Sequence, residues 1–311
     1  MITTQTLSSP RIRISAALVG ALFILASPAS AATIFQTQQG GWNDPATWGG
    51  NAVTTGNTYS SAGGSSNTLN PEGNTTFAGD LIIINAPQVF FTGTATDITG
   101  NMELNNFGTI RRNRAGTAAF NGSINITTAG GFLDADGGGA RTLTINSLLT
   151  SDDNTSVLRI GGNAADNGVI LTNASNTFNG LFDLTEVGFL RSTVQGSLGF
   201  GDLLVDTGSF EATYHFDATI NMNSATVASG GLYELDTFTH TYDPGTFTLD
   251  SANGVIVLGE GIYTVAELNT LAGETLFSGT TGMLSIVPEP TSGSLLAAIA
   301  LVGLLARRRK R

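Results

Sequence analysis

The chain has 311 residues, with 40 glycines, two histidines and no cysteine. The missing thiols exclude a disulfide scaffold, a thiolate zinc site, an iron–sulfur cluster and thiol catalysis, and two histidines argue against a histidine-rich metal centre. All 24 acidic residues lie between Asp44 and Glu289, where there are only six arginines and no lysine, so this middle segment has a net charge of −18. A segment this acidic is a poor partner for nucleic acid. We expect no nucleic-acid partner and no cofactor.

The N-terminal segment has the three parts of a secretory signal peptide. Arg11 and Arg13 supply a basic start, and Ile14–Leu25 is an apolar run of 12 residues. Small residues typical of a cleavage region follow: Ala29, Ala31 and Ala32. Because the run is short for a membrane span of about 20 residues, we predict that residues 1–31 are removed. The alternative is an uncleaved N-terminal anchor.

Short strand patterns dominate residues 32–286. Runs rich in β-branched and aromatic residues alternate with polar ones and are bounded by Gly, Asn, Asp and Ser, which is typical of strands. The clearest runs are Asp80–Asn85, Gln88–Thr92, Ser123–Thr128, Arg141–Asn146, Val157–Ile160, Val169–Thr172, Asp202–Asp206 and Gly254–Leu258. No segment resembles the helices of a βαβ unit, so the sequence predicts an all-β domain. The one helical pattern is Thr264–Leu271, with Val265, Leu268 and Leu271 on one face.

Two architectures fit such strands, a β-solenoid and a β-sandwich. The strands recur as far as Ile286 without a clear hairpin dipeptide, such as Asn-Gly, between matched alternating strands. Asn and Gly occupy many strand exits, as they do at tight corners that need a positive φ. Both features favour a solenoid, in which a coil buries its apolar face only against its neighbours. We predict a parallel β-solenoid and keep the sandwich as the alternative.

Two segments of the body resemble secreted β-helix proteins. Gly41–Gly50 is similar to their Trp-bearing entry segments, so we expect Trp42 and Trp48 to cover the open first coil. Gly168–Ala212 resembles the autotransporter-passenger-associated β-strand repeat, which implies a right-handed parallel β-helix. The positions that match its phrase are Leu171, Asn173, Asn176, Thr177, Phe178, Gly180, Gly188, Leu190, Ser197, Leu198, Gly199 and Gly201.

Charged pairs are the first candidates for chemistry, because an acidic β-helix could be a polysaccharide lyase or hydrolase. Asp134 and Asp136 would share one strand face and could hold a calcium ion. The phrase Asp134–Gly139 lacks the ligand count of a full calcium loop, so we expect a solvated turn there and no metal site. Asp152 and Asp153 are the other acidic pair, and Arg141 and Arg159 are the nearby bases.

Arg111-Arg112-Asn113-Arg114 is the only basic cluster of residues 32–286. It could bind an anionic polysaccharide or a lipopolysaccharide phosphate. Because charged runs are usually solvated, the simpler expectation is an exposed turn.

Histidine and threonine patterns complete the candidates. His215 and His240 have no partner motif, and the chain has no Gly-x-Ser-x-Gly elbow and no P-loop, so we expect both histidines on strand surfaces and no catalytic residue. Threonines spaced by two could form the flat rows of an ice-binding solenoid, although Thr is also a common strand residue. These rows are Thr92/Thr94/Thr96, Thr142/Thr144, Thr237/Thr239/Thr241 and Thr246/Thr248.

The C-terminal segment, residues 287–311, has three parts. Val287, Pro288, Glu289 and Pro290 form an extended spacer because each proline disfavours helix at the residue before it. The apolar stretch Leu295–Ala306 predicts a short membrane segment: counted as a helix from Ser292, it has 15 residues and spans roughly 22 Å, less than a bilayer core of about 30 Å. Five basic residues that would stay in the cytoplasm end the chain: Arg307, Arg308, Arg309, Lys310 and Arg311.

This tripartite tail closely resembles the PEP-CTERM sorting signal of Gram-negative bacteria. The resemblance implies that the tail holds the protein transiently in the inner membrane until an exosortase cleaves near the PEP motif, after which the product reaches the surface or the medium. We therefore predict a secreted, non-enzymatic matrix or biofilm protein with exopolysaccharide as a possible partner. The alternatives are a carbohydrate-active β-helix enzyme and an ice-binding or adhesin-type protein.

Overall fold

The computed structural model describes residues 32–287, except 64–67, 72, 74, 85–87, 92–96, 138, 213–217, 221 and 243–244. Met1–Ala31 and Ala32–Arg311 are separate compact units, and every described residue belongs to the second. The predicted signal peptide and residues 288–311 lie outside the described residues.

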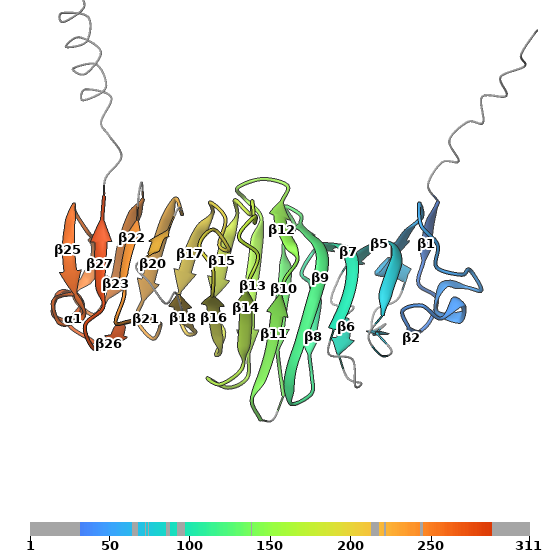
Figure 1. The fold of residues 1–311 in the computed structure, drawn as a ribbon, viewed down its shortest axis with the longest axis horizontal. Coiled ribbons are helices and arrows are strands. Elements are labelled where there is room, and N and C mark those ends of the chain that lie inside the picture. Colours follow the sequence, from blue (N-terminus) through green and yellow to red (C-terminus); the bar gives the residue numbers. More distant parts are fainter. Residues whose placement is uncertain are drawn as a thin grey trace, which may run out of the picture. The chain divides into compact units, whose positions relative to one another are not determined.

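The described chain is a stack of β-coils whose strands follow one another in chain order (Figure 1). Successive strands alternate between two long sheets, here named sheets A and B, and a shorter sheet C lies near the C-terminal end. Sheet A contains β1 (Thr33–Phe35), β3 (Thr58–Ser60), β5 (Thr76–Ile84), β7 (Asp97–Asn105), β9 (Gly116–Ile126), β11 (Arg141–Ile145), β14 (Gly168–Leu171), β16 (Phe189–Ser192), β18 (Ser209–Ala212), β21 (Leu232–Asp236) and β26 (Phe277–Gly279), with β12 (Leu148–Ser151) also paired to β9.

Sheet B contains β2 (Gly40–Gly41), β4 (Leu69–Asn70), β6 (Gln88–Phe91), β8 (Gly108–Arg112), β10 (Gly131–Ala135), β13 (Val157–Gly162), β15 (Leu181–Leu184), β17 (Asp202–Val205), β20 (Ser224–Ala228), β23 (Thr246–Ser251) and β24 (Gly254–Val257). Sheet C contains β19 (Ala218–Ile220), β22 (Thr239–Tyr242), β27 (Met283–Ile286) and β25 (Gly261–Thr264). The helices are η1 (Pro45–Trp48), η2 (Ser61–Gly63) and α1 (Val265–Ala272).

Parallel pairing along both long sheets confirms the β-solenoid and excludes the sandwich, whose sheets are antiparallel. Equivalent residues of successive coils stack in register, and the inward ones form continuous apolar columns. One column runs through Leu143, Val169, Leu190, Phe210 and Tyr233, all fully buried. A coil therefore completes its core only by stacking on the next coil. The right hand of the helix stays a prediction.

Close backbone contact between coils explains several residues of the Gly168–Ala212 phrase. A Cβ on Gly180 would lie 2.1 Å from the Ser156 carbonyl oxygen, and one on Gly201 would lie 1.9 Å from the Gly180 carbonyl oxygen. Asn176 is buried and joins three coils, because its carbonyl accepts from the Leu149 amide at 2.8 Å and its amide donates to the Ser197 carbonyl at 2.7 Å. Gly180, Gly201 and Asn176 therefore allow the turns of successive coils to pack directly on one another.

An aromatic cluster closes the N-terminal end, as the sequence predicted. Trp42 and Trp48 are 1% and 0% exposed and pack against Tyr59 and Phe77, with ring centroids 5.1 to 6.0 Å apart. The Trp48 indole donates to the Trp42 carbonyl at 2.7 Å. The η1 turn that carries Trp48 begins at Asp44, whose side chain accepts from the Ala46 amide. Trp42, Trp48, Tyr59 and Phe77 thus cover the N-terminal end of the core, and this cluster is called the N-terminal lid below.

The C-terminal end is closed differently and corrects one prediction. β23 and β24 form an antiparallel hairpin, with Ser251 opposite Gly254, and its turn contains the Asn253-Gly254 dipeptide that is typical of hairpins. Gly254–Leu258 was predicted as a strand but not as part of a hairpin, because this segment is one apolar run and does not alternate. β25 then pairs antiparallel with β27, so sheets B and C both end on an antiparallel strand.

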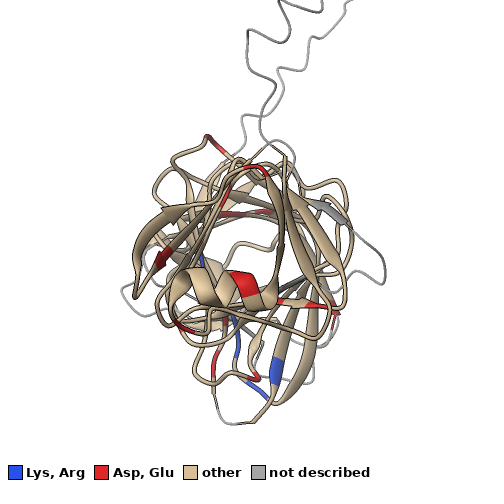
Figure 2. Cartoon of the chain, turned by 90° about the vertical axis from the view of Figure 1, so that its left-hand side faces the viewer, with Lys and Arg blue, Asp and Glu red and all other residues tan. Residues whose placement is uncertain are grey.

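Helix α1 lies across this end of the coil stack (Figure 2). The predicted helix is confirmed, and Thr264 forms a capping box with Glu267. Leu268 and Ala272 are fully buried, whereas Leu271 is 38% exposed, so the predicted apolar face is wrong at Leu271. The reason is that the helix contacts the stack over a narrow stripe.

Candidate functional site

The outer surface of sheet A over β5, β7, β9 and β12 carries ladders of polar side chains, here called the polar face. Along β5 the residues alternate, so Leu81 and Ile83 point into the core and Asp80 and Ile82 point outward. Parallel pairing places Asp80 beside Asn101 and Asn101 beside Ser123. The strand period and the coil register together therefore line up polar groups that are about 21 residues apart in sequence.

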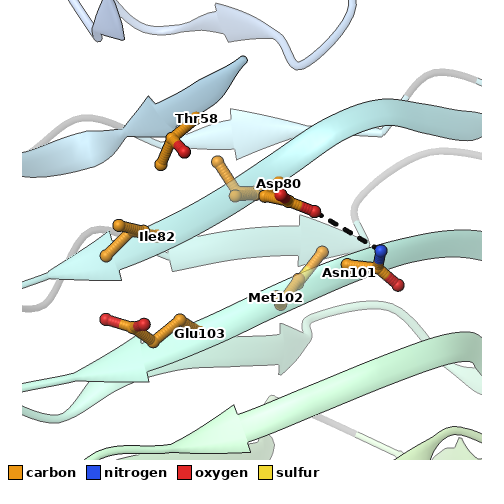
Figure 3. A pocket seen from close by; sticks show the side chains of 7 residues that line it. Thr58, Asp80, Ile82, Asn101, Met102 and Glu103 are labelled. Atoms are coloured by element: carbon orange, nitrogen blue, oxygen red, sulfur yellow. Dashed lines mark hydrogen bonds between the residues drawn. The ribbon is translucent and has the colours of Figure 1, made fainter. Parts of the chain in front are cut away.

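The first ladder crosses three coils. The Asn101 amide donates to Asp80 at 3.4 Å, and the Ser123 hydroxyl donates to the Asn101 carbonyl at 2.9 Å. Next to it lies a shallow hollow of about 280 Å³. Figure 3 shows Asp80 and Asn101 on one side of this hollow and Ile82 and Glu103 on the other. The hollow thus combines carboxylates, an amide and apolar side chains.

A second ladder continues from Glu103. Glu103 lies in register beside Asn125, and Asn125 lies beside Thr150. The Thr150 hydroxyl donates to the Asn125 carbonyl at 2.9 Å, and the Asn125 amide donates to Asp152 at 2.8 Å. Asp152, predicted as half of an acidic pair, therefore belongs to the polar face.

A third ladder runs from β7 and β9 to the residues that directly follow β11 and β14. Asn121 donates to Asp97, Asn146 donates to the Asn121 carbonyl at 3.0 Å, and the Thr172 hydroxyl donates to Asn146 at 2.5 Å. These side chains bond to one another rather than to a ligand, which holds them in fixed orientations. Neighbouring strands are about 4.8 Å apart, so the ladders present hydrogen-bonding groups at a regular interval.

Such a surface suits a hydroxylated polymer. Amides, hydroxyls and carboxylates at fixed spacing can exchange hydrogen bonds with sugar hydroxyls, and preorganised groups lose little entropy on binding. Apart from Asp152, none of these residues was singled out from the sequence. The signal is present as Asn and Asp that recur at intervals of roughly one coil, which is readable only when the coil register is known.

The predicted calcium pair takes a different role. Asp134 is 2% exposed, and its carboxylate lies 2.5 Å from the Arg111 Nε, while Asp136 lies 3.4 Å from the Arg111 Nη1. Burial raises the pKa of Asp134 to about 6, against the opposing effect of Arg111. The expected solvated turn is therefore wrong for Asp134, because neighbouring coils cover it. Within the described ranges, no three acidic or histidine side chains group as metal ligands.

The basic cluster is divided by the strand that carries it. Arg111 and Arg112 belong to β8 and only Arg114 is fully in the turn, so the prediction of one exposed turn is wrong for the first two. Arg111 forms ion pairs with Asp134 and Asp136, whereas Arg112, which is 3% exposed, is not part of these pairs. Arg159 pairs with Asp183 at 3.6 Å. Figure 2 shows most arginine segments in its lower half.

The two histidines have different outcomes. His240 is fully buried and its Nδ1 lies 3.3 Å from the Tyr233 hydroxyl, so the predicted surface position is wrong. It points inward because residues of β22 alternate, with Thr239 and Thr241 half-exposed. His215 lies outside the described residues.

The threonine rows are short where they are described. Thr142 stands between Thr117 and Gly168, and Thr144 stands between Ala119 and Ile170. In sheet B, Thr248 has Thr226 beside it. The row Thr92/Thr94/Thr96 lies outside the described residues. The described rows thus extend over two strands and form no broad flat array.

The sorting segment begins directly at the end of the last coil. Val287 follows β27, donates its backbone amide to the Tyr242 carbonyl at 2.9 Å and is 37% exposed. Pro288, Glu289 and Pro290, the predicted membrane stretch and the basic tail Arg307–Arg311 lie outside the described residues, as do Ala29 and Ala31. Ala32 is the first described residue, just before β1. The chain therefore passes from the solenoid into the motif without a spacer domain.

Comparison with known proteins identifies this segment. Residues 287–310 match the PEP-CTERM protein-sorting motif. The motif implies that the chain is exported as an extracellular or cell-surface protein and is processed by an exosortase at the membrane. No curated protein and no solved structure matches the chain.

No helix within the described ranges is both long and apolar enough to cross a membrane.

Proposed function

We propose that the mature protein is a non-enzymatic component of the bacterial surface or extracellular matrix that binds exopolysaccharide through its polar face. The observation that carries this proposal is the set of hydrogen-bonded ladders across β5, β7, β9 and β12. The sorting motif supports it, because an exosortase substrate is delivered to the surface where such polymers are found.

The proposal includes the route. The signal peptide of residues 1–31 starts export through the inner membrane of a Gram-negative cell. The apolar stretch Leu295–Ala306 and the basic tail then hold the chain in that membrane until the motif is cleaved. The intact mass and location of the chain test this route. Replacing Pro288, Glu289 and Pro290 with alanine should leave a longer chain in the inner membrane, whereas the unaltered chain should lose its tail. Equal mass and location of the two chains would refute the sorting proposal.

Binding to exopolysaccharide tests the polar face. We expect Asn101→Ala combined with Asn125→Ala to lower the affinity for polymer isolated from the producing cells by roughly tenfold, since each change removes a positioned amide. Thr226→Ala combined with Thr248→Ala, on sheet B, is the matched control and should bind as the unaltered chain does. Equal binding by both pairs of variants would contradict the assignment of the polar face.

A second candidate, a carbohydrate-active enzyme, is favoured by the hollow that holds Asp80 and Glu103 together. Two carboxylates that flank a sugar are the basis of glycoside hydrolysis. Release of new reducing ends from the polymer, lost in Glu103→Gln, would establish this function in place of pure binding. Polymer of unchanged length after prolonged incubation with the chain would support the non-enzymatic role.

A further inference from the structure

Three arginines of neighbouring coils gather where sheet B turns into sheet A. Arg112 ends β8, Arg114 lies in the turn that follows, and Arg141 begins β11 one coil later. Arg141 lies in register beside Gly116, and a Cβ on Gly116 would be 3.9 Å from the Arg112 Nη2. The guanidinium of Arg112 is thus next to the backbone that pairs with Arg141.

The electrostatics of Arg112 agrees with this placement. The pKa of Arg112 is lowered, first by burial and then by repulsion from Arg114 and Arg141. The segment that contains these arginines has a net charge of −18, so three positive charges at one place are unusual for its composition. Like charges placed together cost stability unless something of opposite charge joins them.

Arg141 shows that acceptors are lacking. Its side chain is 8% exposed, and its Nε and Nη1 have no hydrogen-bond partner. The ion pairs of the described residues join Arg111 to Asp134 and Asp136, and Arg159 to Asp183, so Arg141 and Arg114 have no carboxylate partner there. A buried guanidinium with unsatisfied donors is costly, and an oxyanion beside it would supply charge-assisted hydrogen bonds.

The surrounding backbone is shaped around this side chain. A Cβ on Gly137 would lie 1.8 Å from the Arg141 Nη1, so glycine leaves the space that the guanidinium occupies. The Arg141 amide donates to the Asn167 side chain at 2.9 Å, and Asn167 in turn donates to the Gly137 carbonyl at 3.2 Å. Arg112 donates to the Ala115 carbonyl at 3.3 Å. The Arg112 guanidinium is therefore held by a hydrogen bond, the Arg141 guanidinium packs against Gly137, and exposed Arg114 forms the rim.

We propose that Arg112, Arg114 and Arg141 bind an oxyanion carried by an acidic polysaccharide, a carboxylate or a sulfate of one sugar unit. This inference rests on the proposed function and gives it a ligand class: the polar face binds sugar hydroxyls, and the arginine site binds the charged substituent. Arg111, although adjacent in sequence, is not part of the site because its partners are Asp134 and Asp136.

Calorimetric titration of the full-length chain in mild detergent tests the site, with dextran sulfate, alginate and neutral dextran as probes. We expect Arg114→Gln to weaken binding of the charged polymers about tenfold. Arg159→Gln removes the same charge from an arginine that has its own aspartate, and it should change binding less than twofold. Preference for alginate identifies a carboxylate as the anion, and preference for dextran sulfate identifies a sulfate. Equal losses in the two variants, or none in Arg114→Gln, would overturn the site.

Inorganic sulfate separates this proposal from the proposed function. At matched ionic strength, sodium sulfate should raise the thermal midpoint of the unaltered chain more than that of Arg114→Gln and of Arg141→Met. Should Arg141→Met fail to fold, Arg114→Gln decides alone, since its side chain is exposed. A sulfate effect without any binding of native exopolysaccharide would refute the proposed function and keep the site. Native polymer binding that is unchanged in Arg114→Gln would refute the site and keep the function.

Discussion

The two ends of the solenoid solve one problem with different chemistry. A stack of parallel coils exposes unpaired strand edges and an open core at each end. At the N-terminal end, buried Trp42 and Trp48 fill the core opening with aromatic rings. At the C-terminal end, two antiparallel strands finish the sheets and α1 covers the core.

The difference shows that an end can be closed either by large side chains that fill the core opening or by strands and a helix that change the direction of the chain. The N-terminal lid depends on a few large side chains, so single substitutions there should be severe. The C-terminal cap distributes the work over a hairpin, a strand and a helix, so individual changes should be smaller. The C-terminal strands also leave Val255, Val257 and Ile262 exposed.

The largest expected effect would break the N-terminal lid. Trp48→Ala should lower the apparent free energy of unfolding by about 3 to 5 kcal/mol, because it leaves a cavity between Tyr59 and Phe77. Chemical denaturation measures the loss, and amide exchange should show it concentrated in the first coils. Phe35→Ala is the control, since Phe35 is 54% exposed and its removal should cost under about 0.5 kcal/mol. A loss below about 1 kcal/mol for Trp48→Ala would refute the lid.

The second prediction tests the C-terminal cap with two leucines of one helix. Leu268→Ala should cost about 2 to 3 kcal/mol, since Leu268 is fully buried against the last coil. Leu271→Ala should cost under about 1 kcal/mol, because Leu271 is 38% exposed. The same denaturation measurement compares them, and equal costs would mean that α1 contacts the stack by another face.

The third prediction concerns the pH dependence of stability and Asp134, which lies in a coil between the two ends of the solenoid. The folded-state pKa of Asp134 is about 6, above its ordinary value of 3.8, so the folded chain binds this proton more tightly than the unfolded chain. Its contribution to stability is present at pH values below about 3.8 and is lost as the pH rises through about 6. We expect up to about 3 kcal/mol of such loss.

Denaturation curves at several pH values measure this effect. In Asp134→Asn the fall in stability between about pH 4 and pH 6 should be smaller than in the unaltered chain. Asp166→Asn, which removes an exposed carboxylate, should keep the full fall. If Asp134→Asn and the unaltered chain had identical pH dependence, the raised pKa of Asp134 would be refuted. The difference in amide exchange between the N-terminal and C-terminal coils should be the same in both chains.

The smallest expected effect concerns the start of the cap helix. Thr264→Ala removes the hydroxyl that accepts from the Glu267 amide at 3.3 Å and should cost about 1 kcal/mol. Thr270→Ala is the control, because the Thr270 hydroxyl bonds only to the Ala266 carbonyl within the helix. Thermal melts of the two variants provide the measurement. A Thr264→Ala midpoint no lower than that of Thr270→Ala would argue against the capping box.

Much of this architecture was readable in the sequence. Period-two alternation located the strands near Arg141 and Val169, the absence of long helices indicated an all-β domain, and Asn and Gly at the strand exits favoured stacked coils. The hairpin at Asn253 was missed because β24 is apolar throughout and resembled another buried strand. The prediction for His240 was wrong because a shift of one residue along a strand moves a side chain from the outer face to the core, and the sequence does not show which face of β22 carries His240.

The sites divide in the same way. The sequence by itself determined the sorting tail and helix α1, because each depends on residues close together along the chain. Only the tertiary structure decided that Asp80 lies beside Asn101, that Arg111 pairs with Asp134, and that Arg141 lies near Arg112. The coils are of unequal length: parallel register partners are 20 residues apart between β16 and β18, 29 between β2 and β4 and 44 between β21 and β26. Stacking alone therefore determines which residues meet.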